Sequence, residues 1–148
     1  MLKIALVLCG VLALAAPAQA QMNSADLKWD TAPPVFPAGA EMAVLSGDPG
    51  KPGTFVIRLK MPAGYKIPAH HHPTDEYVTV ISGDFSLGMG DKLDETKSAY
   101  LTAGGFAEAP AQMNHFAWTK SGAVVQISAD GPFAMTYVNA ADDPTHHR

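Results

Sequence analysis

Short runs of alternating apolar and polar residues, separated by glycine and proline, constrain the fold of this chain more than any other feature. The clearest run is Thr54–Met61, in which Phe55, Ile57, Leu59 and Met61 share one face. Successive side chains of a β-strand point to opposite sides, so this run predicts a strand with one buried face. No stretch outside the first twenty residues keeps a helical period for more than about two turns.

Further runs of the same kind follow along the chain, and most of the turns between them contain glycine or proline, as at 82–84 and 130–132. Many short strands at even spacing in a chain of this size predict an all-β protein, an antiparallel sandwich or barrel. The additional predicted strands are Glu41–Leu45, Glu76–Ile81, Asp84–Met89, Ala99–Leu101, Phe106–Ala109, His115–Thr119, Val124–Ala129 and Phe133–Val138.

Residues 1–20 have the features of a secretory signal peptide. Lys3 precedes an apolar run from Ile4 to Ala16, and small residues end the segment at Ala18-Gln19-Ala20. The run is shorter than the roughly twenty apolar residues that a membrane-spanning helix needs. We therefore expect export to the periplasm or the extracellular space, with no membrane anchor after cleavage.

Cleavage would remove the only cysteine of the chain, Cys9. The mature protein would then have no disulfide, no thiol nucleophile and no cysteine ligand for a metal. Its length suits one domain. The formal net charge of −4 becomes more negative once Lys3 is lost, which disfavours a nucleic-acid partner.

The chain divides into four predicted segments: the signal peptide at 1–20, an extended proline-rich N-terminal arm at 21–40, a barrel at 41–139 and a flexible C-terminal tail at 140–148. The arm contains Pro33, Pro34 and Pro37. Such an arm can lie on the barrel or pair across a homodimer, and a flexible arm is the alternative.

Four residues form a candidate metal site. His70 and His72 are two residues apart and face one side of an extended segment, whereas His71 faces the other. Glu76 has the same parity, and His115 must come from a distant strand. Three imidazoles and one carboxylate suit one divalent first-row ion per chain, and Fe(II), Mn(II), Ni(II), Cu(II) and Zn(II) all fit the ligand types.

The spacing around these residues resembles both motifs of the cupin family. In the first motif, five residues separate Gly64 from His70, one separates His70 from His72, three precede Glu76 and six precede Gly83. In the second, Gly104 is followed after five residues by Pro110, and His115 lies five positions beyond that proline. With the flanking strands, the resemblance extends over about residues 41–138.

Two positions depart from the second cupin motif. Gln112 stands where the family usually has glycine, and Thr119 stands where it usually has asparagine. Because glycine often marks a positive φ, the first change bears on the geometry of the turn. Neither change removes a metal ligand.

The resemblance implies a double-stranded β-helix, the jelly-roll barrel of cupins, with His70, His72, Glu76 and His115 holding the metal inside. It also implies metal chemistry on a small molecule, with Fe(II) or Mn(II) favoured: a dioxygenase first, a lyase or isomerase second. A non-catalytic periplasmic binding protein or sensor is the alternative. Glu108 as a general base and Tyr65 as a phenol donor are the candidate catalytic residues.

Overall fold

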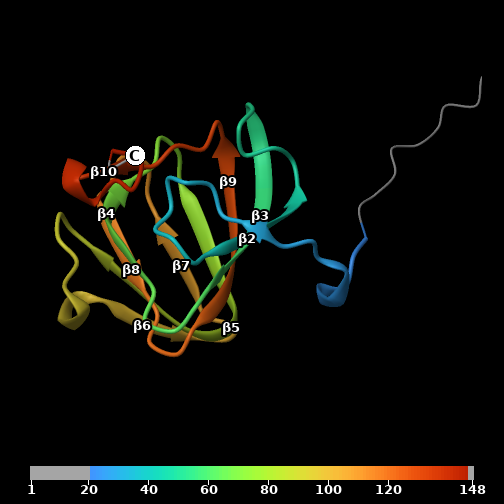
Figure 1. The fold of residues 1–148 in the computed structure, drawn as a ribbon, viewed down its shortest axis with the longest axis horizontal. Helices are drawn as coiled ribbons and strands as arrows, with labels where there is room; N and C mark the ends of the chain where they lie inside the picture. The colour runs from blue at the N-terminus through green and yellow to red at the C-terminus, as the bar shows by residue number, and fades with distance from the viewer. Residues whose placement is uncertain (1–20, 147–148) are drawn as a thin grey trace, which may run out of the picture.

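The computed structural model describes residues 21–146, so the predicted signal peptide at 1–20 and the last two residues of the predicted tail lie outside it. Antiparallel strands make up about half of the described chain (Figure 1). The three helices of the described part, η1 Ser24–Asp26, η2 Glu95–Lys97 and η3 Ala140–Asp142, are single 3₁₀ turns, and none could span a membrane. The strands are β1 Asp30–Thr31, β2 Glu41–Ser46, β3 Gly53–Met61, β4 Lys66–His71, β5 Glu76–Met89, β6 Ala99–Thr102, β7 Phe106–Ala109, β8 His115–Trp118, β9 Ala123–Gly131 and β10 Thr136–Tyr137.

Two groups of strands share β5, and this sharing curls them into a barrel. The first half of β5 pairs with β7 and β9, and β9 continues through β3 and β2 to β1. The second half of β5 pairs with β6 and β8, and β8 continues through β4 to β10. The all-β jelly-roll predicted from the sequence is therefore confirmed.

The sequence predicted two strands at 76–81 and 84–89, but the structure has one long strand, β5. Its pairing with β9 shifts register between Val80 and Ser82, which marks a β-bulge, and Gly83 has a φ of 78°. A bulge bends a strand and lets it pass from one sheet to the next. A Cβ at Gly83 would collide with the carbonyl oxygen of Gly122, so only glycine fits this corner.

Strand β4 was missed because Pro68 interrupts its sequence. Proline cannot donate to a β-ladder, and it is tolerated in strands mainly at edges and bulges. The register between β4 and β8 shifts between Ile67 and His70, around this proline. The shift leaves the carbonyl of Pro68 free to accept a hydrogen bond from the ring of His70.

Alternate residues of the long strands fill the barrel. Phe55, Ile57 and Leu59 of β3 are buried, and Val125 and Ile127 of β9 lie across from two of them. This agrees with the predicted two-faced strand at Thr54–Met61.

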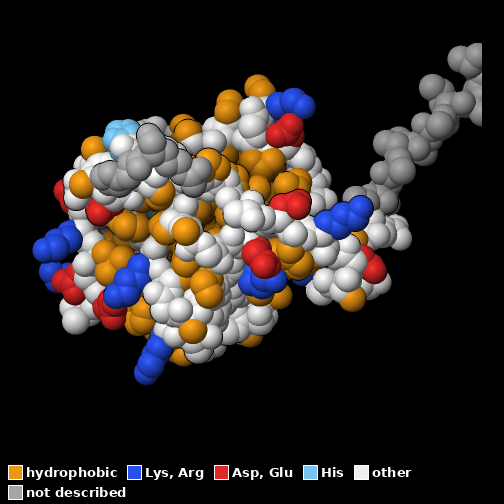
Figure 2. Space-filling model, in the orientation of Figure 1, with side chains coloured by type: hydrophobic (Ala, Val, Ile, Leu, Met, Phe, Trp, Pro, Cys, Tyr) orange, Lys and Arg blue, Asp and Glu red, His pale blue; other side chains and the backbone are white. Residues whose placement is uncertain are grey.

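Part of the predicted N-terminal arm also reaches the core. Ala32, Phe36 and Ala40 belong to the main cluster of buried hydrophobic residues. In Figure 1 the blue segment before β2 crosses in front of the barrel strands, and Figure 2 shows hydrophobic side chains gathered over the middle of the same face. The predicted tail begins with the turn η3.

Candidate metal centre

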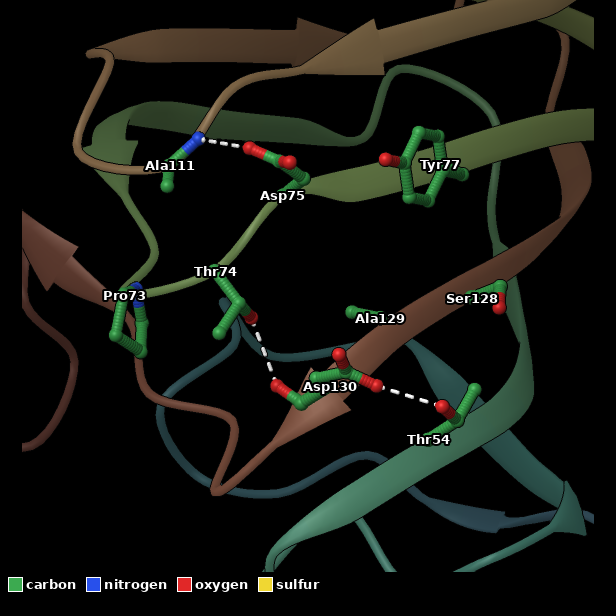
Figure 3. Close-up of a pocket in the computed structure, with 9 residues that line it drawn as sticks. All are labelled: Thr54, Pro73, Thr74, Asp75, Tyr77, Ala111, Ser128, Ala129 and Asp130. Atoms are coloured by element: carbon green, nitrogen blue, oxygen red, sulfur yellow. Dashed lines mark hydrogen bonds between the residues drawn. The ribbon is translucent and has the colours of Figure 1, made fainter.

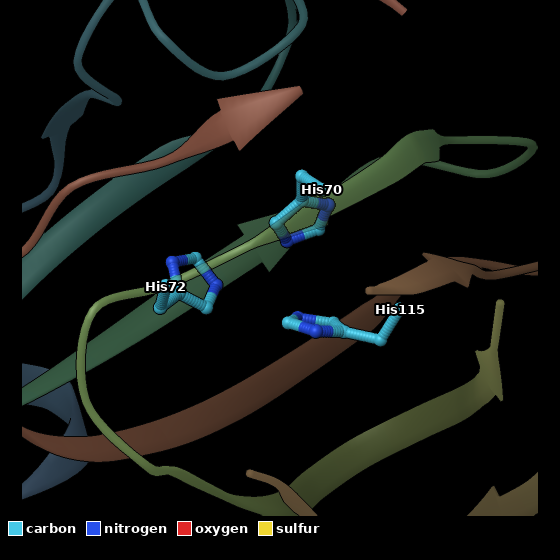
Figure 4. A group of neighbouring side chains, drawn as sticks. All are labelled: His70, His72 and His115. Carbon is cyan, nitrogen blue, oxygen red and sulfur yellow. The ribbon is translucent and has the colours of Figure 1, made fainter. Parts of the chain in front are cut away.

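Three histidine side chains converge inside the barrel (Figure 4). His70 lies on β4, His72 follows that strand directly, and His115 begins β8, where it is in register with His70. Their candidate ligand atoms all lie within 4.8 Å of one another. The three residues are 3%, 2% and 1% exposed, so their rings are shielded from bulk water.

One nitrogen of each ring is fixed by a backbone carbonyl. The Nδ1 atoms of His70, His72 and His115 lie 2.7, 2.8 and 3.0 Å from the carbonyl oxygens of Pro68, Ala134 and Met113. A carbonyl oxygen can only accept, so each Nδ1 carries a proton and donates it. Each neutral ring then has its lone pair on Nε2, the arrangement that orients histidine ligands in metal sites.

Two of the remaining ring nitrogens face a carboxylate without bonding to it. Nε2 of His72 lies 3.7 Å from Oε2 of Glu76, and Nε2 of His115 lies 3.6 Å from the same oxygen. Both nitrogens are buried without a hydrogen-bond partner. These separations exceed hydrogen-bonding distance. They match the roughly 3 to 4 Å between two atoms that each bind one ion at about 2.1 Å, so the residues fit a divalent metal.

Burial sets the protonation of the cluster. It lowers the pKa of His70 to about 3, helped by the neighbouring His115 and His72 rings, and it also lowers the pKa of His72. Burial alone would raise the pKa of Glu76, but His115, His72 and His70 hold that pKa below its ordinary value. Near neutral pH, His70 and His72 are thus neutral and Glu76 is ionised, the states that metal binding requires.

His71 lies apart from this cluster, as strand parity predicted. Its side chain is only partly buried, and its Nδ1 lies 3.0 Å from Oδ1 of Asn114. Asn114 in turn donates from Nδ2 to Asp91 at 2.7 Å. His71 therefore belongs to a polar network on the other side of β4.

The two proposed catalytic side chains lie elsewhere. Tyr65 is buried, its hydroxyl donates to the carbonyl of Pro37, and burial raises its pKa, so the phenol stays neutral. Glu108 is exposed on β7 in register with the exposed Tyr77 of β5, on the side of the sheet opposite Glu76. The structure thus brings together the four predicted ligands but places neither Tyr65 nor Glu108 against them.

Sequence reasoning missed the residues that surround the histidines. The ring of Phe133 stacks on His72, with centroids 4.4 Å apart, and the ring of Tyr137 lies 5.9 Å from that of His70. Both lie in the predicted strand 133–138, but nothing in that run links them to the site. Phe36 lines the same cavity from the proline-rich arm, where no local pattern predicted an inward-facing ring.

The interior cavity at the histidines is small and mainly apolar. Its free space is about 20 Å³, enough for about one water molecule. Besides the four candidate ligands it is lined by hydrophobic side chains: Phe36, Leu59, Ile67, Val78, Phe85, Leu87, Ala117, Val125 and Ile127. A substrate larger than water does not fit beside the histidines in this conformation.

A larger hollow of about 480 Å³ lies on the outside of the barrel (Figure 3). Several of its polar groups are engaged with one another: Asp75 accepts from the Ala111 N–H at 2.7 Å, and Asp130 accepts from the Thr54 hydroxyl at 2.6 Å. The Thr74 hydroxyl donates to the Asp130 carbonyl at 2.7 Å. These bonds hold the surface loops and leave the histidine cluster as the better candidate site.

A comparison with protein families gives a match over most of the chain. The family described as a domain of unknown function, DUF4437, matches residues 18–136. The chain belongs to this family. DUF4437 is a cupin-like family, so the resemblance found in the two motifs is confirmed. No curated protein matches this DUF4437 protein in sequence.

Solved structures show the same fold for the DUF4437 protein. The polyketide cyclase RemF from Streptomyces resistomycificus is 16% identical, with a TM-score of 0.70 and coverage of 88% of this chain and 92% of that one. An RmlC-like cupin from Shewanella frigidimarina is 14% identical (TM-score 0.59; coverage 76% and 91%). KdgF from Halomonas sp. is 16% identical (TM-score 0.58; coverage 77% and 96%). At these identities the likeness establishes the cupin barrel and nothing finer.

Proposed function

We propose that this protein is a mononuclear metal-dependent enzyme that acts on a small molecule. His70, His72, Glu76 and His115 would hold one divalent ion. One observation carries the proposal: the buried Nε2 atoms of His72 and His115 have no partner and face the Glu76 carboxylate, while every Nδ1 is tied to a carbonyl. A buried polar atom without a partner is costly, and a metal ion would relieve that cost.

The ligand types suit several divalent ions; we favour Fe(II) or Mn(II) from the resemblance to cupins, with Zn(II), Ni(II) and Cu(II) as alternatives. A bound ion would supply Lewis acidity or, as Fe(II), redox chemistry with dioxygen. The chain's own residues would prepare the site: the three carbonyls orient the rings, Phe133 shields one face of His72, and Glu76 supplies a negative charge. The similar fold of an enzyme, the polyketide cyclase RemF, supports catalysis in a barrel of this shape.

The test is metal analysis of untagged mature protein, with two histidine variants compared. We expect about one divalent ion per chain. His115→Ala should lower metal affinity by more than about 100-fold, because it removes a ligand, whereas second-sphere changes cost 10- to 100-fold. His71→Ala should change the affinity by less than threefold, roughly, because His71 faces Asn114. Equal effects of the two substitutions would overturn the proposal.

The small interior favours one second candidate, a non-catalytic metal-binding or sensor protein with a closed site. An enzyme must admit an exogenous ligand to the ion, and a closed site must exclude it. Nitric oxide added to the Fe(II)-loaded protein would distinguish them by electron paramagnetic resonance. A nitrosyl signal supports the enzyme, and its absence at saturating nitric oxide supports the closed site.

Export is part of the same proposal. The segment 1–20 supports it through its sequence alone. Fractionation of cells that express the full chain should recover a protein beginning near residue 21 outside the cytoplasm.

A further inference from the structure

The segment 33–39 crosses the barrel with a single buried side chain, that of Phe36. Its two ends are anchored: Ala32 and Ala40 are buried, and the Ala32 N–H donates to the Ala40 carbonyl at 3.0 Å. Gly39, with a φ of 107°, gives the second end a backbone conformation that larger residues rarely adopt. The segment is thus a short loop closed at its base.

Two tyrosine hydroxyls tie this loop to the barrel. Tyr137 donates to the Val35 carbonyl at 2.7 Å, and Tyr65 donates to the Pro37 carbonyl. Within residues 21–146, these are the hydrogen bonds that join 33–39 to the barrel strands. The two acceptors flank Phe36, so both bonds hold its ring in place.

The ring of Phe36 lines the same cavity as the four candidate metal ligands. It shares that cavity with Leu59, Phe85 and Ile127, and only about 20 Å³ remains free beside the candidate ligands. No organic substrate can reach those ligands while the ring is in place. Removal of the ring would expose a hydrophobic space of its own size and shape.

We infer that 33–39 is a lid, and that Phe36 occupies the position of the ring of a small aromatic substrate. The inference deepens the proposed function and rests on it for the metal-binding end of the substrate. The same cavity contains His70, His72, Glu76 and His115, so the substrate carries an oxygen that can bind a metal. The side walls are apolar, so its middle is a single ring.

The two tyrosines add a second requirement. When the lid leaves, Tyr65 and Tyr137 lose their carbonyl acceptors, and their hydroxyls can then donate to another acceptor. The substrate would supply acceptor oxygens in their place. Tyr137 also packs beside His70, so this tyrosine connects the lid to the candidate metal site.

The first experiment measures lid opening in the metal-free protein by hydrogen exchange, so that a failure of metal loading does not affect it. We expect the Phe36 and Ala32 amides to exchange through local opening, faster than the amides of β3 and β9. Tyr137→Phe should speed their exchange about fivefold, and Tyr65→Phe with Tyr137→Phe about 25-fold, the equivalent of one net hydrogen bond each. The amides of β3 and β9 should exchange as before.

Tyr77→Phe is the matched control, because Tyr77 is exposed on the outer face of β5 and does not touch the lid. It should leave exchange of the lid amides unchanged. Two results would show that the lid is a fixed part of the core and that the inference is wrong. The Phe36 amide could exchange no faster than the amides of β9, or the double variant could accelerate exchange of the Phe36 amide and of the β9 amides by the same factor.

The second experiment tests the ring position with phenol as the probe. Phe36→Ala should bind phenol at least tenfold more tightly than the unaltered protein, because the competing ring is gone and no opening has to precede binding. Methyl signals of Leu59, Leu87 and Ile127 should shift, and acetate, an oxygen donor without a ring, should shift none of them. Equal phenol affinity, or shifts confined to the outer surface, would overturn the inference even if the metal site is real.

Should Phe36→Ala not fold, the tyrosine double variant replaces it. Its weakened lid should raise phenol affinity above that of the unaltered protein, and Tyr77→Phe should not. Metal binding without phenol binding would refute the lid and leave the proposed function standing, whereas phenol binding without metal binding would refute the proposed function alone.

Discussion

Gln112 is the one residue other than glycine between 21 and 146 that has a positive φ, 61°. It stands where the cupin motif usually has glycine, and the structure shows that the turn keeps the left-handed backbone despite the larger residue. Its N–H donates to the His72 carbonyl at 2.9 Å, so this turn supports a candidate ligand. Its side chain is exposed, and substitutions there report on the backbone conformation with little effect from packing.

Replacement of Gln112 by glycine and by alanine should therefore reverse the usual order of stability. At a compatible position alanine is more stable than glycine by about 0.4 to 1 kcal/mol. A side chain in the left-handed region costs roughly 1 to 2 kcal/mol, which outweighs that advantage. We expect Gln112→Gly to exceed Gln112→Ala in free energy of unfolding by roughly 0.5 to 1 kcal/mol.

Urea unfolding of the metal-free proteins measures this difference. With an m-value near 2 kcal/mol/M, the midpoints should differ by roughly 0.3 to 0.5 M. Ala111→Gly is the control: Ala111 is the exposed neighbour, its φ is not positive, and glycine should destabilise there. If glycine is also the less stable choice at 112, the left-handed strain does not exist and the argument fails.

Three further predictions concern the corner, a buried carboxylate and the metal. Gly83→Ala should lower the free energy of unfolding by more than about 3 kcal/mol or prevent folding, because the new Cβ meets the Gly122 carbonyl. Gly53→Ala, at a φ of 115° with open space around it, should lower that free energy by only about 1 to 2 kcal/mol, as measured by urea unfolding. Asp84 accepts hydrogen bonds from the Ser121 hydroxyl and from the N–H groups of Lys120 and Ser121, and these bonds lower its pKa. Asp84→Asn should therefore lower the free energy of unfolding by about 2 kcal/mol at pH 7. Because that pKa is depressed, the cost should persist above about pH 4 and shrink as the pH falls through the folded-state pKa; a cost that does not change with pH would contradict the assignment. Mn(II) at 100 times its dissociation constant should raise the free energy of unfolding by about 2.7 kcal/mol. A chelator should abolish this stabilisation, and Glu76→Gln should reduce it at the same Mn(II) concentration.

Local patterns predicted most of the strands and, together with the spacing of the two cupin motifs, the candidate ligand set. Alternation identified Thr54–Met61, and the structure extends that strand by one residue to Gly53. Parity identified His71 as the outward-facing histidine of the three. Both inferences depend only on the two-residue period of extended backbone, which tertiary contacts do not alter.

The features that the sequence missed depend on contacts between distant segments. A glycine at 83 indicates a turn, and only the position of the Gly122 carbonyl makes it a bend within one strand. Pro68 argues against a strand, and only the register shift against β8 accommodates it. Phe36 lies in a segment whose composition predicts an extended or flexible arm, and no local pattern shows that its ring enters the barrel.

The same distinction explains why the ligands were easier to predict than their supports. His72 is held by three contacts from two segments: the Ala134 carbonyl accepts from its ring, Phe133 stacks on the face of that ring, and the Gln112 N–H donates to the His72 carbonyl. Two of these contacts involve backbone atoms, which every residue carries, so no side-chain motif records them. Substitution at 112 tests whether this backbone support matters. Gln112→Pro would remove the N–H that binds the His72 carbonyl and would also exclude the φ of 61°, so it should weaken metal binding, whereas Gln112→Gly keeps both the N–H and the backbone conformation and should not.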